Sequence, residues 1–479
     1  MEPIIRLTPC LWEIHQTGDM RVPGRIYASE KLMRQIQQDE SLKQVRNVAC
    51  LPGIVKYSLA MPDIHWGYGF PIGGVAATDA RSGVISPGGV GYDINCGVRL
   101  LRTDLNADDI RSRIKNLVTA LFNAVPSGLG SHGAIRKLKR KDVREVLLKG
   151  AGWAVENGFG NSSVLNFIED NGQLAGADPD VISERAYQRG MPQLGTLGSG
   201  NHFIEISRIS DIFESEIAEK LGLIPGNIAV FIHTGSRGLG YQVCDDFIKV
   251  TLAATRKYDI HVPDRQLACA PLDSPEGRDY LGAMRGAANF AFANRQVISA
   301  LIEEALLKVL NISPADLGFR LIWDIAHNIA KIEDHDVDGQ ERQLCVHRKG
   351  ATRAFGPGRR ELPPEYRETG QPVLIPGDMG TESYLCVGTS QAMLETFGSS
   401  CHGAGRVLSR TQAKKKSRGR NLYGELAEAG IFVMAEGKTT MAEEMPDAYK
   451  DVTEVVNTMH QAGITKKIAR FTPVGVVKG

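Results

Sequence analysis

Three of the chain's 11 histidines stand in similar surroundings, since each of His202, His233 and His327 is flanked by small or apolar residues. A Gly-rich segment adds a carboxylate and a thiol, Asp93 and Cys96. Imidazole, carboxylate and thiolate are the usual protein ligands of transition metals. Five ligands are one more than a single tetrahedral site uses, so convergence of all five predicts two ions with Cys96 as a bridge. The alternative is that the histidines are hydrogen-bonded core residues and Cys96 is a small buried hydrophobe.

Another histidine, His402, lies in segment 399–406, where small residues leave room for a phosphate and Arg406 could neutralise it. An imidazole nitrogen can attack phosphorus, so His402 is a candidate nucleophile; the alternative is a structural histidine beside a turn. Downstream, segment 414–420 carries five positive charges, which would form either a solvated surface or a site for RNA phosphates. No aromatic residue interrupts this run, so base stacking is not indicated there.

The common nucleotide-binding signatures are missing from the sequence. Residues 437–439 resemble the end of a P-loop, but that motif requires glycine at position 432, which is Phe432. Segment 128–133 satisfies GxGxxG, yet no clear strand precedes it and no acidic partner follows it. The KxDG motif of lysine-dependent polynucleotide ligases is also missing. A Rossmann site, a P-loop and a lysine nucleophile are therefore disfavoured.

Charge and composition narrow the class of protein. The 479 residues include 56 basic and 55 acidic side chains, so a nucleic-acid site must be a local patch. The sequence has no uninterrupted run of 18 apolar residues, so no membrane span is predicted. Glu2, Arg6 and Glu13 interrupt the apolar core that a secretion signal would need. Eight scattered cysteines without CxxC pairs favour reduced thiols. We therefore expect a cytoplasmic protein without a membrane partner.

Short apolar runs predict buried strands at 228–232 and 319–323, which lead directly into His233 and Asp324. Amphipathic periodicity predicts four helices, near 30–46, 107–124, 242–256 and 285–310. Because strands and helices mix without a steady βαβ rhythm, we expect an irregular α+β fold. One domain over residues 1–479 is predicted, with the Pro-rich segment 358–372 as either a surface excursion or a boundary.

Six motifs together resemble those of the RtcB family of RNA-splicing and repair ligases: PDIHWGYG (62–69), GYDINCG (91–97), GSGNHF (198–203), HTGSR (233–237), AHN (326–328) and HGAGR (402–406). Each motif is weak alone, but the ordered set is specific, and the resemblance runs from about residue 60 to the last residue. It implies β-sheets surrounded by helices, neither Rossmann nor P-loop. It also implies joining of an RNA 2′,3′-cyclic phosphate or 3′-phosphate end to a 5′-hydroxyl end, in tRNA splicing, RNA repair or both.

The resemblance implies a role for His402 as the nucleophile that takes GMP from GTP and expels pyrophosphate. The RNA 3′-phosphate would then accept the guanylate, and the 5′-hydroxyl would displace GMP.

The resemblance also implies two Mn²⁺ ions and a set of ligands for each. Cys96, His202 and His233 would hold one ion, and Asp93, Cys96 and His327 the other. Ligand softness alone would favour zinc over manganese.

Position by position, the resemblance carries over a set of nucleotide-binding residues: Asn201, Phe203, Glu205, Asn328, Pro376, Gly377, Asp378, Met379, Ser383, Gly403, Ala404, Gly405, Tyr449 and Lys478. If segment 201–206 is a strand, Asn201 and Glu205 project to one face and His202 to the other. The carboxylate of Glu205 suits guanine, whose N1–H and amino group donate together. Asp378 departs from the small hydroxyl residue expected there, and its charge is unfavourable beside phosphates unless the side chain points away.

RNA contacts are predicted for six cations near His402 and in the basic run: Arg237, Arg406, Arg410, Lys414, Lys415 and Lys416. Members of the family often work with the activating protein archease, which is therefore a candidate partner. Two rival functions remain, a metal-dependent 2′,3′-cyclic phosphodiesterase and a non-catalytic RNA-binding protein. Neither would need a covalent nucleotide on His402.

Overall fold

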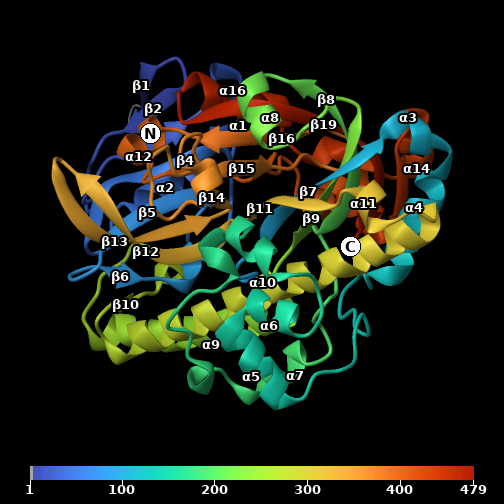
Figure 1. Cartoon of the computed structure of the whole chain (residues 1–479). Coiled ribbons are helices and arrows are strands. Elements are labelled where there is room, and N and C mark those ends of the chain that lie inside the picture. Colours follow the sequence, from blue (N-terminus) through green and yellow to red (C-terminus); the bar gives the residue numbers. More distant parts are fainter. Residues whose placement is uncertain (1–3) are drawn as a thin grey trace.

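The computed structural model describes residues 4–479, whose strands form two large sheets and two small ones (Figure 1). The seven-stranded sheet is built, in spatial order, from β1 (Ile4–Thr8), β2 (Leu11–Ile14), β3 (Gly24–Tyr27), β4 (Ile54–His65), β5 (Ile72–Asp79), β13 (Gln340–Lys349) and β12 (Asn328–Val337). Within it only β3 and β4 run parallel.

The eight-stranded sheet follows the order β11 (Arg320–Ala326), β7 (Gly97–Asn106), β9 (Asn227–Thr234), β8 (Phe203–Ile212), β19 (Thr465–Lys478), β16 (Ser383–Gly388) and β15 (Pro372–Ile375), and β18 (Phe432–Ala435) pairs with β19. The small sheets pair β6 (Val84–Ile85) with β10 (Ala270–Pro271) and β14 (Ala351–Arg353) with β17 (Ser399–Cys401). Antiparallel pairing dominates both large sheets, which confirms the predicted α+β class and excludes a doubly wound sheet.

The helices that the structure describes are α1 (Glu30–Ile36), α2 (Ser41–Val48), α3 (Ala107–Ile110), α4 (Ile114–Ala124), α5 (Arg140–Lys149), α6 (Ala151–Glu156), α7 (Glu184–Gly190), α8 (Ser215–Lys220), α9 (Arg237–Lys257), α10 (Pro275–Leu310), α11 (Pro314–Leu317), α12 (Ser390–Glu395), α13 (Arg410–Lys416), α14 (Leu422–Glu428), α15 (Lys438–Glu443) and α16 (Val452–Gln461). The helices predicted near 242–256 and 285–310 are confirmed as α9 and the longer α10. The single helices predicted near 30–46 and 107–124 are wrong, since each segment is broken. Between α1 and α2, the Asp39 carboxylate accepts a hydrogen bond from the Ser41 backbone N–H at 2.7 Å and starts a new helix.

Helix α10 is the longest element, and its ends follow standard capping chemistry. Ser274 accepts from the Gly277 backbone N–H at 3.0 Å, Pro275 occupies the first turn, and Asn311 ends the helix in the left-handed conformation. Small residues between positions 282 and 293 let neighbouring elements pack close to its buried face. In Figure 1, α10 runs below both large sheets, together with α5, α6, α7 and α9.

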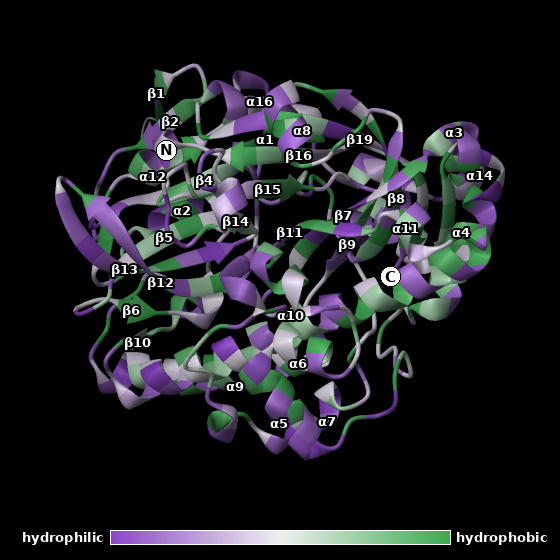
Figure 2. Ribbon diagram, viewed as in Figure 1, coloured by the Kyte–Doolittle hydropathy of each residue, from purple (hydrophilic) through white to green (hydrophobic). Residues whose placement is uncertain are grey.

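Hydropathy follows the same division between interior and surface. Every residue of β9 is buried, and β11 becomes buried towards its end, which confirms the two strands predicted from apolar runs. The far end of the β12–β13 hairpin is purple in Figure 2, in agreement with the exposure of Asp336 and of residues 338–341. In segment 358–372, the Tyr366 hydroxyl donates to the Ile322 carbonyl at 2.6 Å and Leu362 is buried, so this segment packs against the core.

Candidate functional site: a metal-ligand cluster beside His402

The register of the eight-stranded sheet gathers the predicted ligands at one end of its strands. Ala326 at the end of β11 pairs with Gly97 at the start of β7, and Gly97 pairs with Thr234 at the end of β9. One position back, His233 pairs with Phe203 at the start of β8. In an antiparallel sheet the end of one strand lies beside the start of its neighbour. Strands far apart in sequence therefore bring the polar residues at their ends to the same edge of the sheet.

The same edge receives residues from both large sheets and from β17. Phe203 pairs with Lys478 at the end of β19, so the last residues of the chain join the site. From the seven-stranded sheet, β12 begins with Asn328 directly after His327, and β4 ends at His65. Strand β17 then delivers His402.

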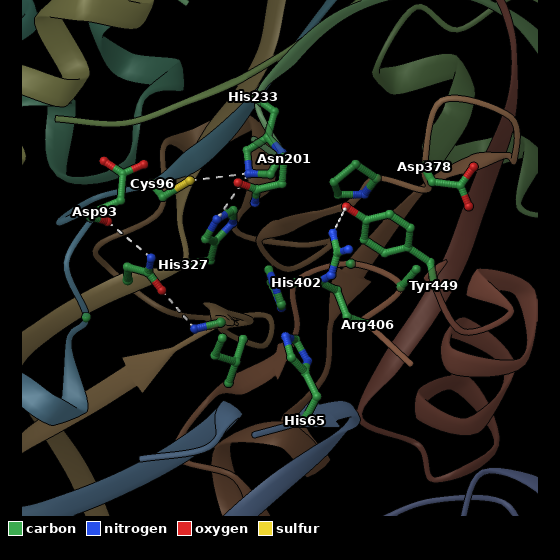
Figure 3. Close-up of a pocket in the computed structure, with 18 of the residues that line it drawn as sticks. His65, Asp93, Cys96, Asn201, His233, His327, Asp378, His402, Arg406 and Tyr449 are labelled. Carbon is green, nitrogen blue, oxygen red and sulfur yellow. Dashed lines mark hydrogen bonds between the residues drawn. The ribbon is translucent and has the colours of Figure 1, made fainter. Parts of the chain in front are cut away.

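The five predicted metal ligands converge around the Cys96 thiol, and Figure 3 shows four of them, Asp93, Cys96, His233 and His327. The Cys96 Sγ lies 3.3 Å from His233 Nε2 and 3.5 Å from His202 Nε2. His202 Nε2 is 2.8 Å from Asp93 Oδ2, and His233 Nε2 is 3.3 Å from His327 Nε2. The ligand atoms form two groups that share Cys96.

The division of these ligands differs from the one that the resemblance implied. The structure groups Asp93 and His202 with Cys96, and His233 and His327 with the same thiol. The Asp93 carboxylate faces His202, whereas His327 faces His233, so the geometry favours His202 beside Asp93 and His327 beside His233. Cys96 belongs to both groups, as a bridging ligand would.

The donor set fits metal ions by its chemistry. Burial holds the pKa of His233 and of His327 well below the usual range, so both rings are neutral and keep lone pairs. His202 Nδ1 lies 2.9 Å from the Leu197 carbonyl, to which it can donate, and this tautomer leaves its Nε2 lone pair directed at Cys96 and Asp93. Three buried lone pairs that converge on a thiol and a carboxylate need a cation to compensate them.

The loops that carry these ligands are tied to α10 by a buried arginine. Arg295 donates at 2.9 Å to the Asn95 carbonyl and at 2.9 Å to the Thr234 carbonyl, next to Cys96 and His233. Asp324, which is also fully buried, pairs with Arg295 and with Arg99, each at 2.7 Å. Sequence reasoning missed this network, although a charged residue in the apolar helix around position 295 was a signal for it.

His402 stands against the metal-ligand cluster and is held by Asp63. The ring centroids of His402 and His327 are 4.8 Å apart. Asp63 Oδ2 accepts from His402 Nδ1 at 2.6 Å and from the His402 backbone N–H at 3.0 Å. Burial alone would raise the pKa of the Asp63 carboxyl, but its contacts with His402 lower that pKa below the usual value. With Nδ1 occupied by Asp63, the Nε2 lone pair is free for chemistry.

Two further features shape the surroundings of His402. Gly350, at φ +61°, passes so close that a Cβ there would lie 3.1 Å from His402 Cε1 and would meet Ile72 and Gly73. His65 lines the same cavity, and its Nδ1 lies 3.0 Å from the Asp63 carbonyl. Burial lowers the pKa of His65 to about 4, so this second imidazole is neutral.

A cavity of about 400 Å³ adjoins the cluster and includes most of the predicted nucleotide-binding residues. Its lining contains eleven of them: Asn201, Phe203, Asn328, Pro376, Gly377, Asp378, Gly403, Ala404, Gly405, Tyr449 and Lys478. Met379 instead packs into the hydrophobic core. Asn201 precedes β8 in a turn and does not belong to a strand, so the predicted alternation of faces does not extend to it.

Glu205 and Ser383 lie behind this wall as a buried pair. Glu205 Oε1 accepts from the Ser383 hydroxyl at 3.0 Å and from the Ser207 hydroxyl at 2.5 Å. Burial raises the pKa of Glu205 to about 7. Asp378 accepts from the Gly380 backbone N–H at 2.8 Å, and Figure 3 shows its carboxylate directed away from His402. This orientation removes the conflict that a charge at position 378 posed for phosphates.

The sequence suggested that Arg406 is free to bind phosphate, but in the structure its guanidinium is already bonded to other side chains. Its guanidinium donates to the buried Glu444 carboxylate at 3.0 Å. It also donates to the Tyr449 hydroxyl at 3.1 Å, as Figure 3 shows. Tyr449 also donates to Glu444. Lys478 lines the same wall, and burial lowers the pKa of its amine to about 8.

The other predicted RNA-binding cations fall into two places. Arg237 lies 3.2 Å from His202 Nδ1, and Arg410 lines the cavity while 57% of its side chain is exposed. Lys414 and Lys415 line a second cavity of about 430 Å³ together with Thr411, Arg418, Lys438, Thr439 and Ala442. Lys416 pairs with Asp447 at 2.9 Å outside that cavity. Within residues 4–479, no helix is long and apolar enough to cross a bilayer.

The fold and the site together define a class of α+β protein in which an Asp/Cys/His cluster that could hold two ions adjoins a cavity beside a carboxylate-held histidine. The chain belongs to the RtcB family, since the family model described as tRNA-splicing ligase RtcB matches residues 44–479. It is 54% identical to the tRNA-splicing ligase RtcB of Archaeoglobus fulgidus over the whole of both chains. It is 53% identical to that of Thermococcus kodakarensis, over 100% of this chain and 99% of the relative. The RNA-splicing ligase RtcB of Mycobacterium tuberculosis is 50% identical over 91% of this chain and 100% of its own.

Proposed function

We propose that the chain is a GTP- and manganese-dependent RNA ligase that joins a 2′,3′-cyclic phosphate or 3′-phosphate end to a 5′-hydroxyl end, in tRNA splicing, RNA repair or both. Membership of a family whose members are named RNA-splicing ligases supports the ligase activity. The observation that carries the nucleotide chemistry is His402, fixed by Asp63 between a metal-ligand cluster and a cavity of nucleotide size.

In the first step of the proposed reaction, the Nε2 lone pair of His402 attacks the α-phosphorus of GTP, and pyrophosphate leaves. Asp63 accepts a hydrogen bond from Nδ1 throughout, so it orients the ring and stabilises the positive charge that develops on the imidazole. Lys478 lines the cavity and supplies a positive charge to the bound nucleotide. Bound Mn²⁺ would supply Lewis acidity that stabilises negative charge on the phosphate oxygens.

In the later steps water first opens a cyclic end to the 3′-phosphate and leaves a free 2′-hydroxyl. The RNA 3′-phosphate then takes GMP from His402, and the 5′-hydroxyl attacks that phosphate and releases GMP. Guanylation is needed because a bare 3′-phosphate has no good leaving group. The buried carboxylate of Glu205 suits a guanine base, since it can accept from N1–H and from the amino group together. The half-exposed cations Arg410, Lys414 and Lys415 suit the RNA backbone.

A labelling experiment tests this proposal directly. Incubation with α-labelled GTP and Mn²⁺ should leave an acid-labile, alkali-stable adduct on the protein. His402→Ala should abolish the adduct but keep metal binding, whereas His261→Ala, which changes an exposed histidine, should change neither. Ligation of RNAs with defined ends, with GTP and Mn²⁺ omitted in turn, tests the complete reaction.

The same experiment separates the rival functions. A metal-dependent cyclic phosphodiesterase would open the cyclic end without GTP and would form no adduct. A non-catalytic RNA-binding protein would bind RNA in a salt-dependent manner and alter neither end. Absence of the adduct at saturating GTP and Mn²⁺ would refute the proposed ligase.

A further inference from the structure

A column of planar groups leads from the cavity to the surface. Tyr68 and Tyr92 line the cavity, and their ring centroids are 5.8 Å apart in an edge-to-face contact. Tyr92 stacks on Tyr241, with centroids 4.8 Å apart and an interplanar angle of 24°. The Arg189 guanidinium lies 5.0 Å from the centroid of Tyr241. We call Tyr92, Tyr241 and Arg189 the aromatic column.

The aromatic column is held by elements that also position the metal ligands. Tyr92 directly precedes Asp93, Tyr241 lies near the start of α9 shortly after His233, and Arg189 belongs to α7. Arg189 is kept in place by a hydrogen bond to the Gln242 side chain at 3.2 Å. A planar ligand on the column would therefore lie at a fixed position relative to Asp93.

The column is exposed where it reaches the surface. The side chain of Tyr241 is 46% exposed, and neither Tyr92 nor Tyr68 is fully buried. Scattered exposed aromatics are ordinary, but here the stacked rings are continuous from the cavity to solvent. The cation of the column is Arg189, whereas the nearby amine of Lys349 is buried, donates to the Phe70 carbonyl at 3.1 Å and has its pKa lowered by burial to about 7. Aromatic faces beside cations are the usual elements of sites for single-stranded nucleic acid.

We propose that the aromatic column stacks the terminal nucleobases of an RNA end and thereby holds that end against the metal-ligand cluster. This inference rests on the proposed function, since it identifies the subsite for one of the two RNA ends. The base of GTP is not the occupant, because the proposed function assigns the guanylate to the part of the lining that contains Phe203, Tyr449 and Lys478, and Tyr241 lies outside that lining. The column instead offers aromatic and guanidinium groups without a base-specific acceptor, which suits ends of any sequence. A base would stack there by joining or displacing the Arg189 guanidinium over Tyr241.

Tyr241→Ala and Tyr241→Phe form the matched pair of variants that tests the column. Stacking on an aromatic side chain contributes enough that its loss should raise KM for the bound RNA end roughly tenfold, with kcat little changed. Tyr241→Phe keeps the ring and should behave like the unmodified protein. Labelling with GTP in the absence of RNA should be the same in all three proteins, since Tyr241 lies outside the guanylate wall.

Abasic RNAs identify the occupant and the end that it comes from. One series lacks the terminal base of the 5′-hydroxyl RNA, and another lacks the terminal base of the 3′-phosphate RNA. For the end that stacks, the abasic RNA and Tyr241→Ala should each raise KM, and the two together should raise it no further. Two results would overturn the proposal. One is that, for both RNA ends, the abasic RNA and Tyr241→Ala raise KM independently, so that their effects multiply. The other is that Tyr241→Phe raises KM as much as Tyr241→Ala does.

A binding measurement keeps the test separate from ligation. RNA with 2-aminopurine at the stacking end should lose fluorescence on binding to the unmodified protein and to Tyr241→Phe, but not to Tyr241→Ala. Equal quenching by all three proteins would refute the column as a stacking site. If the protein formed no guanylate adduct, the proposed ligase would fail, while the quenching pattern would still decide whether the column binds nucleobases.

Discussion

Asp63→Asn removes one charge beside His402 and preserves the shape of the side chain. Asp63 is completely buried, and its Oδ2 accepts two hydrogen bonds from His402, at 2.6 Å from the ring and 3.0 Å from the backbone. An asparagine oxygen can still accept, but it no longer stabilises the positive imidazole that forms as Nε2 attacks phosphorus. A hydrogen bond to a charged group contributes about 1.5–3 kcal/mol, so the rate of guanylation should fall about 10- to 150-fold.

The assay is single-turnover transfer of label from α-labelled GTP to the protein, at saturating GTP and Mn²⁺. Because the pKa of Asp63 lies below its usual value, the carboxylate stays ionised, and the defect should be constant between about pH 6 and pH 9. Asp273→Asn changes an exposed acid and should leave the rate unchanged. Thermal unfolding of both variants shows whether Asp63→Asn still folds. A folded Asp63→Asn protein with an unchanged rate would refute the argument that this charge orients and stabilises His402.

Three other outcomes follow from buried groups in and around the site. Burial raises the pKa of Glu205 to about 7, so GTP affinity measured by calorimetry should fall about tenfold between pH 8 and pH 6, and Glu205→Gln should lose this dependence. The same proton binds the folded protein more tightly than the unfolded chain, so its contribution to the free energy of unfolding rises as pH falls through 7; an unchanged slope in Glu205→Gln would contradict this. Asp324→Asn leaves Arg99 and Arg295 buried without their anion, and urea unfolding should show a loss of about 3–5 kcal/mol, whereas a loss below about 1 kcal/mol would argue against the clamp. Mn²⁺ at 100 times its dissociation constant should stabilise the protein by about 2.7 kcal/mol, and Cys96→Ala should remove most of that gain; equal stabilisation of both proteins would exclude Cys96 as a bridging ligand.

Much of the candidate site was predictable from the sequence because its ligand types are scarce and stand in distinctive local settings. His202, His233, His327, Asp93 and Cys96 each lie in a short motif that can be read without neighbours in space, and the structure brings all five together. The P-loop and the GxGxxG site could likewise be disfavoured from residues that are close together in the sequence. The α+β class and the strand before His233 followed from apolar runs and periodicity, which depend on residues close in sequence.

Helix breaks were less predictable, since amphipathic periodicity continues across them. The segments near 30–46 and 107–124 keep an apolar face throughout, yet the first is broken between Ile36 and Ser41 and the second passes through a 3₁₀ turn at Arg111–Arg113. The side-chain bond from Asp39 to the backbone of Ser41 is one such interruption. Periodicity reports which face is buried, whereas helix ends depend on individual caps.

The sequence by itself determined which residues can bind metal, attack phosphorus and accept from guanine, because those properties belong to the side chains. Only the tertiary structure decided that Asp93 faces His202, that Asp63 holds His402, and that Glu444 neutralises Arg406. These pairs join residues from 38 to 339 positions apart. They follow from strand register and side-chain direction, and a shift of one residue in one strand would turn a ligand from the site to the opposite face of the sheet.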